Sequence, residues 1–156
     1  FNITMKIKWI LLTFLIFGLS GCGYKSIYSS SEANFNIKKI EIIEDSRLNK
    51  KILNRLEVYS DPKSNNIINI RINSNKAISV VSKDARGNPK IFNMTISVAI
   101  EILKDGSVVQ NKNFIESFAY ENTSKKFELN QYEKNIQLNL LDEIIENIVL
   151  YLQTSY

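Results

Sequence analysis

The sequence predicts an α+β domain, a two-layer sandwich in which two helices cover one face of a four-stranded, mainly antiparallel sheet. Two observations support this fold class. Apolar and polar residues alternate over two long segments, 67–81 and 91–103, which is typical of strands with one buried face. Apolar residues recur at helical spacing in two further segments, one before these strands and one at the end of the chain. The predicted order is strand, helix, three strands, helix.

The first two elements are short. A strand is expected around residues 38–43. The helix after it has apolar residues at i, i+4, i+8 and i+11, namely Leu48, Ile52, Leu56 and Tyr59. We expect Asp45 or Ser46 to cap its N-terminus, and Asp61-Pro62 to end it, because the residue before a proline disfavours the helical conformation.

The three long strands follow with clear turn signals between them. The residues expected to be buried are Ile68, Ile70, Ile72, Ile78 and Val80 in the first, and Phe92, Met94, Ile96, Val98, Ile100 and Ile102 in the second. Arg86-Gly87-Asn88-Pro89 marks the turn between them. Asp105-Gly106 is a two-residue hairpin turn that leads into a third strand, from Ser107 to about Tyr120.

A long helix is expected at the end of the chain. Its apolar stripe consists of Ile136, Leu140, Ile144, Ile148 and Leu152. Asn130 and Glu133 have the spacing of a capping box, which predicts a start at Asn130, although a start nearer Ser124 is an alternative. Since no internal repeat or second core is recognisable, residues 36–156 are expected to form a single domain.

Composition removes the common routes to catalysis. Histidine is absent, which excludes histidine bases and the usual metal ligand; the single cysteine excludes an intrachain disulfide. Three of the five glycines lie before residue 24, so no glycine-rich phosphate loop can form. We therefore expect no enzyme, no metal and no catalytic residue. A remote alternative is a periplasmic hydrolase that uses two carboxylates from Glu101, Glu116, Glu121, Asp142, Glu143 and Glu146; the last three lie off the apolar stripe and indicate a solvated face.

The N-terminal segment, residues 1–21, has the pattern of an export signal, with Met5 as the expected start. Lys6 and Lys8 precede an apolar run that is shorter than the roughly 20 residues of a membrane span. Leu19-Ser20-Gly21-Cys22 resembles the lipobox of bacterial lipoproteins, in which the cysteine receives a diacylglyceryl group. We expect this covalent lipid on Cys22 and no other cofactor.

The segment after the lipobox has two implications. Residues 22–35 are rich in serine and are expected to form a lipidated tether. Gly23, rather than aspartate, follows the cysteine, and by resemblance to the sorting rule of such lipoproteins this implies the outer membrane. Without Lys6 and Lys8, 18 basic side chains face 16 acidic ones, so the net charge falls to +2 and binding of nucleic acid is not expected.

Several segments together resemble the LptE family of lipopolysaccharide-assembly lipoproteins. They are Ser20-Gly21-Cys22-Gly23-Tyr24 at the lipobox, residues 117–122, and residues 130–133, within the predicted order of elements. The resemblance implies a lipid-anchored protein on the periplasmic side of the outer membrane that plugs the LptD β-barrel, helps it assemble, and assists insertion of lipopolysaccharide into the outer leaflet. Another outer-membrane accessory lipoprotein, such as a pilotin or a barrel-assembly helper, remains an alternative.

The solvent-facing side of the predicted sheet is the candidate surface for the barrel. It carries mainly amide and hydroxyl side chains, from Asn69, Arg71, Asn73, Asn93, Thr95 and Ser97. The ordinary interpretation is the hydrated side of a one-sided sheet. A surface with little charge would also suit the polar lumen of a barrel, where unpaired charges are costly to desolvate.

Basic residues indicate a candidate lipopolysaccharide site. Lys83, Arg86 and Lys90 flank one predicted hairpin turn, and Lys125 and Lys126 form a second basic stretch before the last helix. Arginine pairs with phosphate in a bidentate manner, and lipopolysaccharide carries phosphates. The alternative is an ordinary exposed turn whose lysines reflect the composition of the chain.

Substituting the lipobox cysteine tests the anchor. Cys22→Ser should abolish incorporation of a clickable fatty acid and leave an uncleaved precursor, because the hydroxyl cannot form the thioether. Unaltered labelling of the serine variant would contradict the lipoprotein assignment.

Overall fold

The computed structural model describes residues 35–43 and 47–155. The expected signal peptide (1–21), Cys22, the tether up to residue 34, and the capping residues Asp45 and Ser46 lie outside the described residues.

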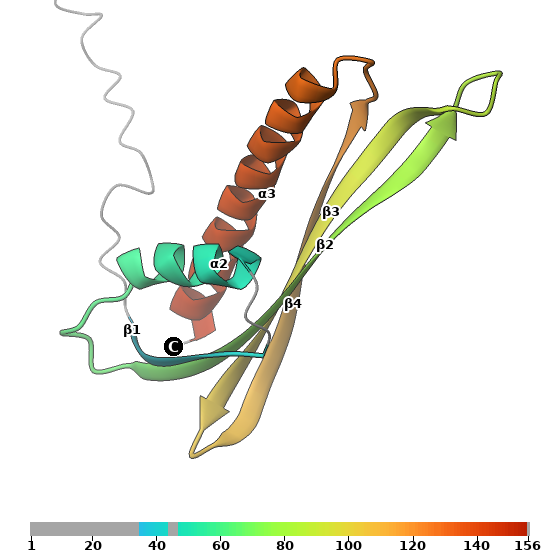
Figure 1. The fold of residues 1–156 in the computed structure, drawn as a ribbon. Helices are drawn as coiled ribbons and strands as arrows, with labels where there is room; N and C mark the ends of the chain where they lie inside the picture. Colours follow the sequence, from blue (N-terminus) through green and yellow to red (C-terminus); the bar gives the residue numbers. More distant parts are fainter. Residues whose placement is uncertain (1–34, 44–46, 156) are drawn as a thin grey trace, which may run out of the picture. The chain divides into compact units, whose positions relative to one another are not determined.

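The described residues form one four-stranded sheet with the spatial order β1-β2-β3-β4. The strands are β1 (Asn36–Ile42), β2 (Ile67–Lys83), β3 (Pro89–Lys104) and β4 (Ser107–Glu121). Strand β1 pairs with β2 in parallel, while β2, β3 and β4 form an antiparallel meander. The predicted mainly antiparallel sheet and the predicted order of elements are confirmed (Figure 1).

Two helices pack on the same face of this sheet, as expected. Helix α2 (Arg47–Val58) connects the parallel strands β1 and β2 and packs on them, while α3 (Lys126–Ser155) packs on β3 and β4. Helix α3 therefore begins at Lys126, and the predicted start at Asn130 is wrong. The hydroxyl of Thr123 accepts a hydrogen bond from the backbone N of Lys125 (3.3 Å), so the chain turns into the helix one turn earlier, close to the alternative start at Ser124.

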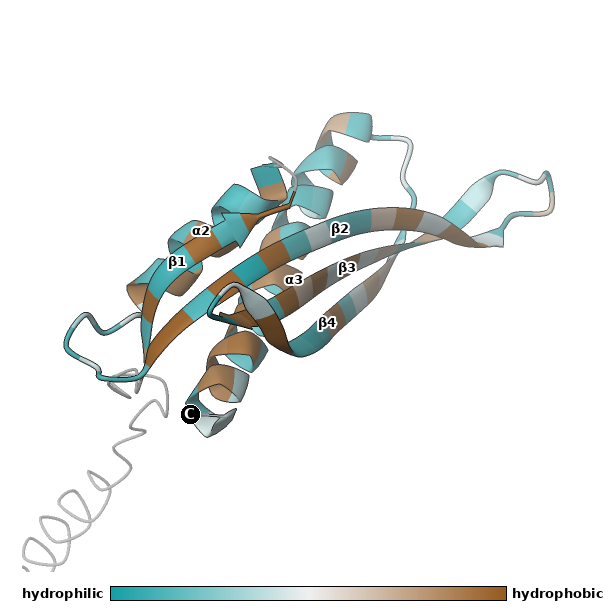
Figure 2. Cartoon of the chain, turned by 90° about the horizontal axis from the view of Figure 1, so that it is seen from below, coloured by the Kyte–Doolittle hydropathy of each residue, from teal (hydrophilic) through white to brown (hydrophobic). Residues whose placement is uncertain are grey.

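The core lies between the sheet and the two helices. Apolar side chains at even-numbered positions alternate with mainly polar side chains over the first part of β2 and along β3, as the banding in Figure 2 shows. The buried ones belong to the same core as the apolar stripes of α2 and α3. Fully buried members include Ile70, Ile96, Ile100, Ile144 and Leu152. One polar side chain, Asn49 of α2, is also fully buried, and its Oδ1 accepts a hydrogen bond from the hydroxyl of Ser74 at 2.6 Å.

The distal part of β2 departs from the expected burial. Ile78 and Val80 were expected in the core, but they are 44% and 43% exposed. Helix α2 packs on the first part of β2, where this strand pairs with β1. The β2–β3 hairpin continues beyond the region that the helices cover (Figure 1). The alternation therefore identified the correct face of the strand, although neither of the two described helices covers that face at its far end.

The two hairpin turns form where the sequence predicts them. Gly87 (φ +83°) lies in the turn between β2 and β3. Asp105 (φ +52°) and Gly106 (φ +81°) connect β3 to β4; positive φ at both positions is what a two-residue turn requires when it follows the twist of the strands.

Shortening one buried side chain of α3 tests the predicted packing. Ile144→Ala should lower the free energy of unfolding by about 2–5 kcal/mol, because it leaves a cavity between α3 and the sheet. Leu150→Ala, on the same helix but 59% exposed, should change it by less than about 0.5 kcal/mol. Equal losses in chemical denaturation would contradict this packing of α3.

Candidate functional site

The candidate barrel-facing residues lie on the open face of the sheet. Asn69 and Arg71 alternate with buried isoleucines along β2, and Asn93 and Thr95 lie on either side of the buried Met94 of β3. All four side chains are therefore directed away from the helices and are half-buried among their neighbours. The amide of Asn93 donates a hydrogen bond to the hydroxyl of Thr95 at 3.1 Å. The amide and hydroxyl character of this part of the face agrees with the expectation.

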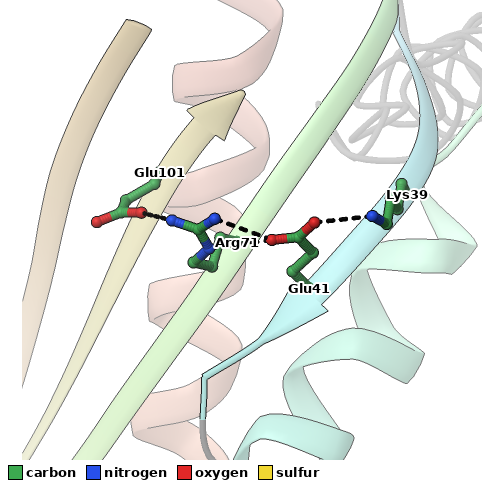
Figure 3. A network of polar contacts seen from close by, with 4 residues as sticks. All are labelled: Lys39, Glu41, Arg71 and Glu101. Atoms are coloured by element: carbon green, nitrogen blue, oxygen red, sulfur yellow. Dashed lines mark hydrogen bonds and ion pairs between the residues drawn. The ribbon is translucent and has the colours of Figure 1, made fainter. Parts of the chain in front are cut away.

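Arg71 differs from the expected uncharged surface, because it belongs to a row of charges. Its Nη1 donates to Glu101 on β3 at 2.9 Å, and its Nε and Nη2 donate to Glu41 on β1 at 3.1 and 3.0 Å. Lys39 donates to the other oxygen of Glu41 at 2.8 Å (Figure 3). The strand register causes this arrangement, since Arg71 lies directly opposite Glu41 on one side and Glu101 on the other.

These four residues, the charged row, neutralise one another. The hydrogen bonds from Lys39 and Arg71 hold the pKa of the Glu41 carboxyl below its usual value. The hydrogen bond to Glu41, and to a smaller extent the one to Glu101, raises the pKa of Arg71. A carboxyl whose pKa is lowered by folding stabilises the fold above its unfolded pKa, and this contribution is lost as the pH falls through the folded pKa. The row thus joins β1 to the centre of the sheet and presents little net charge.

The β2–β3 turn is held in shape by one carboxylate. Asp84 accepts hydrogen bonds from the backbone N of Arg86 (2.9 Å) and of Asn88 (2.8 Å), and from the Asn88 amide (3.1 Å). These hydrogen bonds lower the pKa of Asp84, and the bond from the Asn88 side chain makes the largest contribution. The side chains of Lys83, Arg86 and Lys90 are exposed around this ordered turn, and within the described part of the chain none of them has an ion-pair partner.

The second basic stretch lies at the same end of the sheet. The backbone N of Asn122, after β4, donates to the carbonyl of Lys90 at 2.8 Å, and the Asn122 amide donates to the carbonyl of Pro89 at 2.8 Å. Lys126 donates to Asn122 at 3.4 Å, and Lys125 forms an ion pair with Glu128 at 3.0 Å. We call the five cations Lys83, Arg86, Lys90, Lys125 and Lys126 the basic end; the structure brings them to one end of the sheet (Figure 1).

An aromatic cluster next to the basic end was not identified from the sequence. The hydroxyl of Tyr120 donates to Glu133 of α3 at 2.7 Å, and its ring lies 5.8 Å from that of Phe92 and 6.2 Å from that of Tyr132. Burial raises the pKa of Tyr120, and the hydrogen bond to Glu133 raises it further. The sequence predicts a helix cap that includes Glu133. Its position three and seven residues before the buried Ile136 and Leu140 is the signal that places it on the side of α3 facing the sheet.

Two shallow grooves flank α3. One of about 190 Å³ lies against β4 and is lined by Phe118, Tyr132, Asn135, Ile136, Asn139, Leu140 and Glu143. The other, of about 270 Å³, lies against α2 and is lined by Arg55, Val58, Tyr59, Asp142, Ile145 and Glu146. An ion pair between Arg55 and Asp142 bridges the second groove.

The carboxylates considered for a hydrolase are dispersed. Glu101 is bound to Arg71, Glu116 accepts a hydrogen bond from Asn147 at 3.3 Å, and Asp142 is paired with Arg55. Within residues 35–43 and 47–155, no group of three or more acidic, histidine or cysteine side chains could hold a metal ion. Over the same residues, no helix has both the length and the apolar character needed to cross a membrane.

Comparison with solved structures places the fold among bacterial lipoproteins. The chain is similar to rare lipoprotein B from Shewanella oneidensis (TM-score 0.50, 16% identity, 72% of this chain and 95% of that one). It is similar to a minor lipoprotein from Acinetobacter baumannii, with a TM-score of 0.61 and 11% identity over 79% of this chain and 92% of that one. It is also similar to an uncharacterized lipoprotein B from Nitrosomonas europaea, with a TM-score of 0.57 and 9% identity over 77% of this chain and 85% of that one. At these identities the likeness concerns the fold alone. No family model and no curated protein sequence matches the chain.

Proposed function

We propose that the chain is an LptE-like lipoprotein, anchored through Cys22 to the periplasmic side of the outer membrane, which plugs and helps assemble the LptD β-barrel and assists insertion of lipopolysaccharide. The observation that carries the proposal is the shared fold with rare lipoprotein B, a name under which LptE is also known, over 95% of that protein. The lipobox at residues 19–22 and the resemblance of the segments around it support the same assignment.

The open face of the sheet supports contact with a barrel lumen. Its central residues carry amides and hydroxyls, and the charged row at the β1 side compensates its own charges. A surface of this kind loses little when its water is replaced by the polar wall of a barrel, whereas an unpaired charge would be costly to desolvate. We therefore assign the barrel contact to Asn69, Asn93 and Thr95, with Arg71 acting mainly inside the sheet.

Photocrosslinking tests both the partner and the orientation. A photoreactive residue at Asn69 or Thr95 should capture the LptD barrel in cells, whereas the same residue at Leu150, which is exposed on α3, should capture much less. Capture from Leu150 alone would reverse the orientation. If purification through a tagged chain yields a lipidated protein without a large β-barrel, the LptE assignment fails in favour of another accessory lipoprotein.

The basic end supports direct contact with lipopolysaccharide. The Arg86 guanidinium is exposed on a turn that Asp84 holds in shape, so it can pair with a phosphate without reordering the backbone. Lys83 and Lys90 lie beside it, while Lys125 and Lys126, near the base of the turn, have contacts within the chain. Arg86 is therefore the principal candidate.

Reversing the charge at this turn should weaken binding of lipopolysaccharide. Arg86→Glu is expected to raise the dissociation constant by about tenfold, since a charge-assisted hydrogen bond is replaced by repulsion, with little effect on the melting temperature. Lys104→Glu, an exposed lysine at the other end of β3, is the matched control. Undiminished binding by an Arg86→Glu, Lys90→Glu double variant would remove this site and leave the barrel contact unaffected.

A further inference from the structure

In the described part of the chain, strand β4 forms a long edge of the sheet that has no neighbouring strand. Among the described residues β4 pairs only with β3. The backbone N of Asn122 donates to the carbonyl of Lys90, and paired residues in this register alternate between hydrogen-bonded and non-bonded positions. Even-numbered residues of β4 therefore direct their backbone groups toward β3. The odd-numbered ones, Val109, Asn111, Asn113, Ile115, Ser117 and Ala119, direct theirs away from the sheet.

This edge has few of the features that normally prevent pairing. It runs over 15 residues, contains no proline, and carries charge only at Lys112, Glu116 and Glu121. Val109 and Ile115 are 51% and 56% exposed on it. Natural proteins usually shorten, cover or charge such an edge, because unpaired backbone groups on a long strand favour addition of another strand.

We propose that β4 pairs with β4 of a second copy of this chain, antiparallel about a two-fold axis at Phe114. Phe114 is the middle residue of Ser107–Glu121, so this register overlaps the two strands over their whole length. It places Lys112 of each copy opposite Glu116 of the other, which gives two complementary charge pairs. The outward backbone groups of Asn113 and Ile115 then face each other across the interface.

Charge selects this register over its neighbours. Centring the axis on Lys112 or on Glu116 would bring like charges directly opposite one another, which destabilises a cross-strand pair. Centring it on Asn113 or Ile115 would leave both charges opposite uncharged residues. Only the axis at Phe114 pairs them. At this position the two half-buried Phe114 rings, each already in edge contact with Tyr151 (5.8 Å), meet on the helix face, and aromatic cross-strand pairs are favourable.

Charge reversal and charge exchange test the pairing. The full chain in detergent should sediment as a dimer at micromolar concentration. Lys112→Glu and Glu116→Lys should each raise the dimer dissociation constant on the order of tenfold, and the double variant should restore the original value. Lys134→Glu, an exposed lysine of α3, should leave it unchanged. A monomeric chain, a loss in the control as large as in Lys112→Glu, or failure of the double variant to restore the dimer overturns the proposal.

Disulfide formation tests the register independently. In a Cys22→Ser background, a chain with Asn113→Cys mixed with a chain with Ile115→Cys should form a mixed disulfide, because directly opposite residues of a bonded pair have Cα atoms about 5.5 Å apart. Asn113→Cys mixed with Ala119→Cys should not. Equal disulfide yields in the two mixtures would refute the two-fold axis at Phe114. Neither experiment uses lipopolysaccharide or a barrel, so failure of this inference, which concerns the chain outside a barrel, is distinguishable from failure of the proposed function.

Discussion

The packing of α3 onto β3 and β4 is the interaction on which the rest of the structure depends. Both strands turn the same face toward α3, and the fully buried isoleucines of β3 and α3, namely Ile96, Ile100, Ile144 and Ile148, lie in this layer. With burial of an isoleucine contributing about 1.5–3 kcal/mol, this interface accounts for much of the stabilisation available to a domain of this size. It also leaves the opposite face of the sheet free, which is the face proposed for the barrel.

Sequence periodicity predicted the architecture well because β2 and β3 each have one solvent-facing side and one side that packs toward the core. The alternation in β2 and β3 identified the buried residues from Ile68 to Ile72 and from Met94 to Ile102. It could not show where helical cover ends, so Ile78 and Val80 were misplaced. The start of α3 was misplaced for a different reason: a capping-box spacing also arises inside a helix, where Glu133 instead meets the hydroxyl of Tyr120 across the layer.

The candidate site was predictable only in part, because its character depends on register. The sequence could place Arg71 on the open face, but not beside Glu41 and Glu101, which are 30 residues away on either side and reach it only through strand pairing. Arg86 was easier to place, since it lies within a local turn whose Asp, Gly and Asn residues define its shape. The approach of Lys125 and Lys126 to that turn required knowledge of where β4 ends.

The position of α3 after the three long strands affects the order in which the domain can fold. The meander β2–β3–β4 is connected by short turns and can form from local contacts, but the apolar face of β3 and β4 is covered by a helix made of 30 residues that follow these strands. A chain that emerges from a ribosome or a translocation channel with its N-terminus first therefore exposes this face until α3 has been released. Completion of the core is a late event, and until then the nascent sheet is vulnerable to aggregation and proteolysis.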